Sequence, residues 1–225
     1  MAFAAHLELA RAVIDECDKT GLYCGEALWG RYVPSRAVID RIIDSGRIGA
    51  VTGINANLCY PMTHKARLTD PNLAGGALLD VGIYPLTFID MVMGAQEIDH
   101  LATSMQPYPT GVDAQSTTTL YYADTTMATA LSSMLCVSDR EGMVYGTEAH
   151  LACHIYDTDH ARVDHIDMPE QLTGYEYEVA ASVQAIRAGK RDTIEMPHAD
   201  TLRMMALLDQ IRDEWGLVFP FEHQD

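Results

Sequence analysis

Apolar residues recur at helical spacing near the start of the chain. They predict a helix over residues 4–20, with Gly21 following as its C-terminal cap. A second helix is expected to have Ser35 as its N-cap and to stop at Ser45–Gly46. Between the two, the short apolar run over residues 26–29 is typical of a buried strand. The opening pattern is therefore helix, strand, helix.

The middle of the chain changes from strand-like to continuously apolar character. Residues 48–58 read as a strand, and residues 59–74, with two prolines and few apolar anchors, predict an irregular loop. Residues 75–94 are strongly apolar and bounded by glycine at both ends, so we expect a helix there. Proline removes an internal helical hydrogen bond, so Pro85 and the nearby Gly82 predict a break or kink near residue 84.

The second half of the chain is rich in residues that suit pleated surfaces. Turn signals separate several strand candidates, which predicts an antiparallel meander over residues 116–122, 125–137, 142–147, 149–156 and 161–168. Two helices are expected after it, at about 174–188 and 199–215. Strands kept apart from helices predict an α+β fold with a large open, predominantly antiparallel sheet and helices on one face. The other face then needs a partner, so we expect a homodimer through the sheet.

Composition narrows the classes of partner. The chain has 225 residues, 48% of them hydrophobic, which is enough for one domain or a little more. Its formal charge of −17 argues against nucleic acid and anionic membrane surfaces. We find no apolar run near the ~20 residues of a membrane span and no signal peptide. Five cysteines without a C-x-x-C pair suggest reduced thiols in a cytoplasm.

The segment Gly75–Tyr84 carries the sharpest chemical signal. Asp80 and Tyr84 are four residues apart and share one face of a helix, a plausible proton-handling pair. Gly75 and Gly76 would let a backbone or a cofactor approach closely, so we assign them to cofactor binding. Spacing alone favours a plainer interpretation, in which Asp80 caps or pairs locally and Tyr84 is packed with its hydroxyl in water.

Other candidates are weaker. His150 and His154 share a face, but no spacing here matches a known zinc pattern, and we predict no metal site. His64 lies in the irregular loop, where ligand contacts tend to occur, although a lone loop histidine is more often solvated. Trp29 is explained by core packing when it is considered alone. No G-x-G-x-x-G or P-loop pattern is present, so the chain should not bind a nucleotide phosphate by itself.

Several of these segments, in order and over nearly the whole chain, resemble the Gfo/Idh/MocA oxidoreductases. The matching pieces are Glu26-Ala27-Leu28-Trp29-Gly30-Arg31-Tyr32-Val33-Pro34, Ser45-Gly46-Arg47-Ile48-Gly49, Ala74-Gly75-Gly76-Ala77-Leu78-Leu79-Asp80-Val81-Gly82-Ile83-Tyr84, and Gly174-Tyr175-Glu176-Tyr177-Glu178 with Gly189-Lys190. Within the family, the sequence is most similar to the dimeric dihydrodiol dehydrogenase and D-xylose 1-dehydrogenase branch.

The resemblance implies roles for particular residues. Tyr84 would give or take the proton of the substrate hydroxyl or carbonyl, with Asp80 beside it as a second catalytic residue. Trp29 would line the substrate pocket, His64 would lie in a loop over it, and Leu58 is counted with them as substrate-binding. Hydride would pass between the substrate carbon and a nicotinamide.

The resemblance also implies one large departure from the family. The chain would begin where the family's Glu-Lys-Pro motif ends, so we expect the N-terminal Rossmann domain and the motif's lysine to be missing from it; none of its three lysines precedes a proline. Residues 1–30 are then the remnant of a cofactor domain, and residues 31–225 are the substrate-binding and dimerisation domain. The helix over 4–20 should have lost part of its packing surface. NAD or NADP would serve the complete enzyme, and we expect neither to bind tightly to this chain alone.

Two functional hypotheses follow. In the first, the chain is the substrate and dimerisation portion of an NAD(P)-dependent oxidoreductase that acts on a sugar or trans-dihydrodiol hydroxyl, inactive by itself. In the second, it is a non-enzymatic sugar-binding or assembly module that uses the open sheet for dimerisation.

Overall fold

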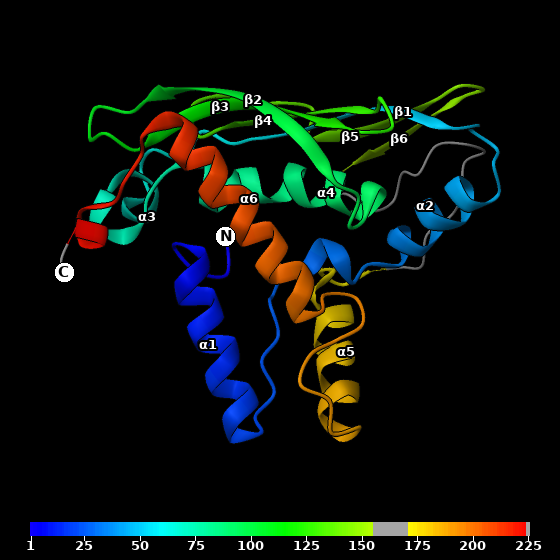
Figure 1. The fold of residues 1–225 in the computed structure, drawn as a ribbon, viewed down its shortest axis with the longest axis horizontal. Helices are drawn as coiled ribbons and strands as arrows, with labels where there is room; N and C mark the ends of the chain where they lie inside the picture. Colours follow the sequence, from blue (N-terminus) through cyan, green and yellow to red (C-terminus); the bar gives the residue numbers. More distant parts are fainter. Residues whose placement is uncertain (155–170, 224–225) are drawn as a thin grey trace.

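A computed structural model describes residues 1–154 and 171–223. A six-stranded sheet forms one layer, and the helices lie on one side of it (Figure 1). The strands are β1 (Val51–Cys59), β2 (Ile98–Pro107), β3 (Asp113–Tyr122), β4 (Met127–Ser133), β5 (Glu141–Gly146) and β6 (His150–His154). The α-helices are α1 (Leu7–Thr20), α2 (Pro34–Asp44), α3 (Ala66–Thr69), α4 (Ile83–Met93), α5 (Tyr175–Arg187) and α6 (His198–Trp215). Short 3₁₀ or π turns form η1 (Trp29–Arg31), η2 (Pro71–Leu73), η3 (Leu78–Gly82) and η4 (Pro220–His223). The predicted α+β class is confirmed.

The sheet is not the simple meander that the sequence predicted. Its order is β2-β3-β4-β1-β5-β6, so β1 lies between β4 and β5. It pairs parallel with β4, Ala56 lying opposite Ala130, while every other neighbouring pair is antiparallel. A parallel pair requires a long connection, which the chain between β1 and β4 supplies through α4 and the β2–β3 hairpin. The sequence did not predict β2, and the strand expected at 161–168 lies outside the described residues.

Three of the four residues over 26–29 are buried, but the run forms no strand, which corrects the predicted opening. Glu26 and Leu28 are almost fully buried, yet no strand pairs with this segment in the described structure. Its backbone is held from elsewhere: the Cys24 N–H donates to the Arg191 carbonyl, and Tyr32 Oη donates to the Glu26 carbonyl. The burial of this segment could therefore be predicted from its apolar composition. Strand pairing could not, because it requires a neighbouring strand, and the composition of the segment does not show whether one is present.

Three boundary predictions also change. Val33, not Ser35, is the N-cap of α2, because Pro34 occupies the first helical position, where its missing N–H costs nothing. The loop over 59–74 contains two short helices, α3 and η2. Helix α1 begins at Leu7 rather than residue 4 and ends, as predicted, at Gly21 with a left-handed φ of 80°.

The apolar helix over 75–94 continues through residue 84 without the predicted break. Its irregularity lies one turn earlier, in the π-turn η3, where the Ile83 N–H reaches back five residues to the Leu78 carbonyl. The wider turn accommodates Pro85, whose ring would otherwise meet the carbonyl of Val81. Residues 71–93, with a mean hydropathy of 1.4, form one segment long and apolar enough to cross a membrane, contrary to our expectation from sequence. Within the 18-residue window that meets this criterion, 72% is buried inside the protein.

Two hydrophobic clusters hold the layers together. The larger one joins α4 and α6 to the sheet, through residues such as Ile83, Ile89, Leu208 and Ile211 against Ile54 and Leu120. The smaller one lies at one end of the sheet and comprises Leu58, Leu68, Ala77, Val81, Val112, Ala114 and Met134. Tyr84 packs against both clusters. Helix α1 is anchored to α6 by the Leu7 N–H, which donates to Asp209 Oδ2 at 2.8 Å, while its Leu9 and Val13 are exposed.

A buried ion-pair network joins η1, α4 and α6. Asp90 of α4 accepts hydrogen bonds from Arg31 and Arg203, and Asp200 also pairs with both arginines. The side chains of Arg31 and Asp90 are only 3% and 9% exposed. Removing one partner from such a network leaves charge buried without compensation, which destabilises strongly.

We therefore expect Asp90→Ala to lower the free energy of unfolding by about 3 kcal/mol in urea denaturation. The matched control is Asp40→Ala, which breaks the more exposed pair with Arg36, four residues earlier in α2, and should cost about 0.4 kcal/mol. Equal losses in the two variants would contradict the structural role assigned to the network.

Candidate functional site

The turn that joins η3 to α4 presents Asp80 and Tyr84 at the place where the chain begins. The Met1 nitrogen donates to Tyr84 Oη at 3.1 Å and also interacts electrostatically with Asp80. The Ala2 N–H donates to the Leu79 carbonyl at 2.6 Å, which fixes the first residues against this turn. π-turns within α-helices occur frequently at functional sites, and here the wider turn carries the acidic residue.

Asp80 has an ion-pair partner that sequence reasoning missed. Arg67 of α3 places Nη2 2.8 Å from Asp80 Oδ2, with side chains 44% and 12% exposed. The guanidinium therefore covers the solvent side of an otherwise buried carboxylate. Arg67 lies in the segment that the sequence predicted to be an irregular loop, so nothing local in the sequence distinguished it from a solvated arginine.

Glu26 is a second acidic group near the start of the chain. Its side chain is buried, takes hydrogen bonds from Thr201 and from the Phe3 N–H, and interacts electrostatically with the Met1 amino group. Burial raises the pKa of the Glu26 carboxyl, and Oε2 has no hydrogen-bond partner among the described residues. Tyr84, Asp80 and Glu26 thus surround a nitrogen atom, with Arg67 next to Asp80; we call this group the Tyr84 cluster.

The glycines predicted to bind a cofactor are packed inside the protein. A Cβ on Gly76, whose φ is +134°, would overlap Asp113 Oδ1, and one on Gly75 would lie 2.7 Å from the Asp70 carbonyl oxygen. Asp113 Oδ2 accepts the Leu78 N–H at 2.7 Å and so caps the helix that these glycines introduce. Burial raises the pKa of Asp113 to about 7, opposed by the N–H groups that it accepts. Asp113 starts a strand, where sequence gave no reason to suspect a cap.

The remaining predicted residues do not gather at one point. Leu58 is fully buried in the smaller hydrophobic cluster, on which Tyr84 packs, and it offers no exposed surface to a substrate. His64 is exposed in the loop that leads to Arg67. Trp29 is 7% exposed and packs against Gly174 and Tyr175 at the start of α5, with ring centroids of Trp29 and Tyr175 6.0 Å apart. Their assignment to a substrate pocket stays a prediction.

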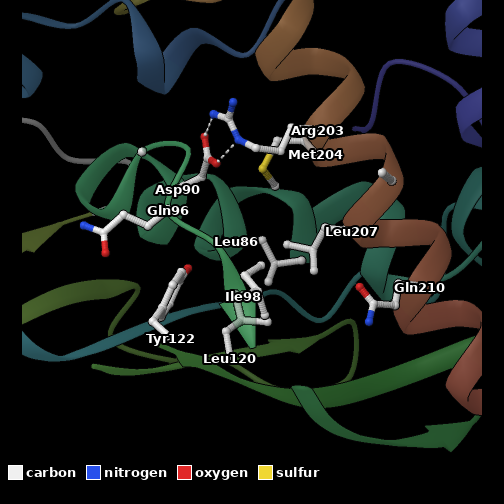
Figure 2. Close-up of a pocket in the computed structure, with 12 residues that line it drawn as sticks. Leu86, Asp90, Gln96, Ile98, Leu120, Tyr122, Arg203, Met204, Leu207 and Gln210 are labelled. Carbon is white, nitrogen blue, oxygen red and sulfur yellow. Dashed lines mark hydrogen bonds and ion pairs between the residues drawn. The ribbon is translucent and has the colours of Figure 1, made fainter. Parts of the chain in front are cut away.

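Two cavities flank the buried helix. One of about 180 Å³ is lined by Met1–Ala5, Leu73, Ala74 and Leu79, whose side chains are apolar, and lies beside the Tyr84 cluster. The other, of about 170 Å³, lies between α4, α6 and the β2–β3 edge; Figure 2 shows Leu86, Leu120 and Leu207 around it and the Asp90–Arg203 pair at its rim. Leu86 lies two residues beyond Tyr84, about 200° around the helix, so this second cavity is on the other side of α4.

No group of three histidine, cysteine, aspartate or glutamate side chains comes within reach of one metal ion in residues 1–154 and 171–223. His150 packs near Tyr145, with ring centroids 6.5 Å apart, and the side chain of His154 lies outside the described residues.

Comparison with models of known protein families shows which family the chain belongs to. Residues 37–152, more than half of the chain, match the GFO/IDH/MocA C-terminal domain. The chain belongs to the Gfo/Idh/MocA family. Its relatives include trans-1,2-dihydrobenzene-1,2-diol dehydrogenase of Danio rerio, 25% identical over 98% of this chain and 70% of the relative. The enzyme of the same name from Macaca fascicularis is 28% identical over 93% of this chain and 67% of its own length.

Solved structures agree on the fold of this Gfo/Idh/MocA chain. Aldose–aldose oxidoreductase from Caulobacter crescentus, solved with glycerol, superposes with a TM-score of 0.81 at 17% identity, over 96% of this chain and 69% of that one. A 3-ketoreductase from Actinomadura kijaniata, solved with NADP and TDP-benzene, gives a TM-score of 0.78 at 19% identity, over 93% and 68%. In each case roughly a third of the other protein has no counterpart in this sequence.

The buried Asp113 should make stability depend on pH. Its pKa is about 7 when folded and 3.8 as a free carboxyl, so the folded state holds a proton that the unfolded state releases between these values. The resulting stability is fully present below pH 3.8 and is lost as the pH rises through 7. At 1.36 kcal/mol per pH unit, the interval corresponds to at most about 4 kcal/mol.

We therefore expect the unfolding free energy of the wild type, measured relative to Asp113→Asn, to fall as the pH rises from 4 to 7. Urea denaturation of both proteins across this range measures it, and subtracting the variant removes the contribution of the other carboxyl groups. A difference that stays constant over the range would contradict the raised pKa of Asp113.

Proposed function

We propose that this chain is the substrate-binding and dimerisation portion of an NAD(P)-dependent oxidoreductase acting on a hydroxyl of a sugar or trans-dihydrodiol. One observation carries the proposal: the Met1 amino nitrogen lies 3.1 Å from Tyr84 Oη and interacts electrostatically with the Asp80 and Glu26 carboxyl groups. The family membership and the names of the dihydrodiol dehydrogenase relatives support the reaction class and the substrate class.

Tyr84 is the proton carrier in this proposal. A phenol ordinarily loses its proton near pH 10, and a cation close to the oxygen favours the charged form. Burial lowers the pKa of the Met1 amino group, whereas the Asp80 and Glu26 carboxyl groups oppose that shift and favour a cation there. In the family resemblance, the proline of the Glu-Lys-Pro motif stands directly ahead of Met1, and the motif's lysine, one residue earlier, would supply the cation at this point. Tyr84 Oη would then take the proton of the substrate hydroxyl, or return it to a carbonyl, with the cation stabilising the phenolate.

In this proposal, the cofactor's phosphates bind outside the described residues. The helix N-terminus after Gly76 is the natural place for an anion, but Asp113 already accepts the Leu78 N–H there, and its carboxyl group would repel a phosphate. We therefore assign cofactor binding to the part of the family's chain that has no counterpart here. Exposed apolar side chains on α1 and α5 offer a surface for it, namely Leu9, Val13, Val179, Val183 and Ile186.

The assay that tests the proposal follows absorbance of reduced cofactor with D-xylose or a trans-dihydrodiol and NADP. It is run on this chain alone and with the cofactor domain of a dihydrodiol dehydrogenase relative added. We expect turnover only in the mixture. Absence of turnover in both would contradict the enzymatic proposal and favour a sugar-binding or assembly module, which calorimetry with the sugar alone would detect.

In the active mixture, Tyr84→Phe should lower kcat by about 10²–10⁴-fold, because general acid–base groups contribute that much. Tyr145→Phe removes a hydroxyl from an exposed tyrosine on the sheet and should leave the rate unchanged. Retention of activity in Tyr84→Phe would remove this residue from its role.

We also propose a homodimer through the sheet. The face of the sheet opposite the helices carries no covering element in the described structure (Figure 1). Alternation along the strands places Thr119, Leu131 and Tyr145 on this face, and Leu131 and Tyr145 are 37% and 41% exposed. A broad face of threonine and scattered apolar side chains suits pairing with a second copy.

Leu131→Arg should then shift the protein to monomer in sedimentation velocity, because it would bury two unpaired charges at a twofold contact. The control, Leu22→Arg, changes a residue 62% exposed just beyond the end of α1, away from the sheet, and should leave the dimer intact. A dimer that survives Leu131→Arg but not Leu22→Arg would place the interface elsewhere.

A further inference from the structure

The end of β1 and the chain that follows β4 run side by side and bring two cysteines together. In the parallel pairing, Cys59 lies opposite Ser133, and beyond the strands the N–H groups of Tyr60 and Met62 donate to the carbonyls of Ser133 and Met134. Cys136 follows directly. The thiols of Cys59 and Cys136 are hydrogen-bonded to each other, and the Ser138 hydroxyl also bonds the Cys59 sulfur.

The turn that carries Cys136 is fixed in place by several contacts. The Arg140 N–H donates to Asn57 Oδ1, Asn57 Nδ2 donates to Asp139 Oδ1 at 2.6 Å, and Arg140 Nη1 donates to Tyr60 Oη at 2.9 Å. The Arg140 guanidinium also lies 5.2 Å from the centre of the Tyr60 ring. Both cysteines are therefore held by their own neighbours, and little motion is needed for the sulfurs to meet.

The two thiols differ in access. Cys136 is exposed and Cys59 is buried, while both are free. Burial raises the pKa of the Cys59 thiol to about 11, so it is protonated near neutral pH and shielded from solvent. An accessible cysteine poised beside a second thiol is the arrangement of a reactive cysteine and its resolving partner.

We propose that Cys59 and Cys136 form a reversible redox site, at which hydrogen peroxide converts the two thiols to a disulfide. The Cys136 sulfur attacks peroxide, the O–O bond breaks, and a sulfenic acid and water result. The Cys59 sulfur then attacks the Cys136 sulfur, an S–S bond forms, and the S–O bond breaks to release a second water. One peroxide thus accepts two electrons from two thiols, and a dithiol reductant reverses the change.

The disulfide would act on the loop next to the Tyr84 cluster. Cys59 is the last residue of β1, and the chain beyond it leads through His64 to Arg67, which pairs with Asp80. A disulfide from Cys59 to Cys136, in the turn after β4, fixes the first residues of this loop. Its effect on catalysis rests on the proposed function, whereas formation of the bond does not.

The test treats the full chain with a small excess of hydrogen peroxide and maps disulfides in a tryptic digest. The digest is informative because Cys17, Cys24, Cys59 and Cys136 fall in four different tryptic peptides, and Cys153 falls in a fifth. The expected product joins the peptide over 48–65 to that over 68–140, disappears with dithiothreitol, and slows amide hydrogen exchange in residues 60–70.

Two variants sharpen the result. Cys136→Ser, a substitution at an exposed position outside the core, should reduce the cross-linked peptide to background. The double variant Cys17→Ser/Cys24→Ser removes the other pair of neighbouring thiols and should leave the product undiminished. Sulfinic or sulfonic acid on Cys136 with Cys59 still a free thiol, or pairing of either residue with Cys153, would overturn the proposal.

Discussion

The helix formed by η3 and α4 is buried on nearly every side, and this burial determines where the fold can hold charge. A buried ionised group is tolerated only when another part of the chain compensates it. Asp80 meets Arg67 from the loop, Asp90 meets Arg31 and Arg203, and the helix N-terminus meets Asp113. Each partner comes from a different element, so the polar groups of one helix also tie together the sheet edge, η1 and α6.

Periodicity in the sequence was sufficient for elements whose stability comes from one apolar face. The helices α2, α5 and α6 and the strands β3 to β6 fall close to their predicted positions for that reason. Pairing between distant strands is different, because the place of β1 beside β4 depends on which neighbour completes the sheet and not on any residue of β1 alone. The π-turn has the same origin, since it accommodates Pro85 within a helix whose burial favours continuity.

The residues of the candidate site also differ in whether the sequence alone could predict them. Asp80 and Tyr84 could be proposed from their spacing and from the family resemblance, because both lie in one short segment. Arg67, Glu26 and Asp113 could not, since each acquires its role through a contact made across the fold. At Gly75 and Gly76 the sequence predicted close approach of a backbone or a cofactor; the structure shows the protein's own backbone at Gly75 and Asp113 at Gly76, and cofactor binding by these glycines stays a prediction.

The segment over residues 22–28 lacks strand pairing and also carries a residue of the Tyr84 cluster. Its composition is that of a buried strand, yet its backbone is held by Arg191, by Tyr32 Oη and by His198, whose Nε2 lies 2.8 Å from the Cys24 carbonyl oxygen. Single contacts of this kind leave neighbouring backbone groups able to pair with a further strand. Glu26 in the same segment points toward the start of the chain, where Tyr84 and Asp80 lie. A cofactor domain that docked along this segment would therefore bring its own residues to Tyr84 and cover the exposed apolar side chains of α1 by the same contact.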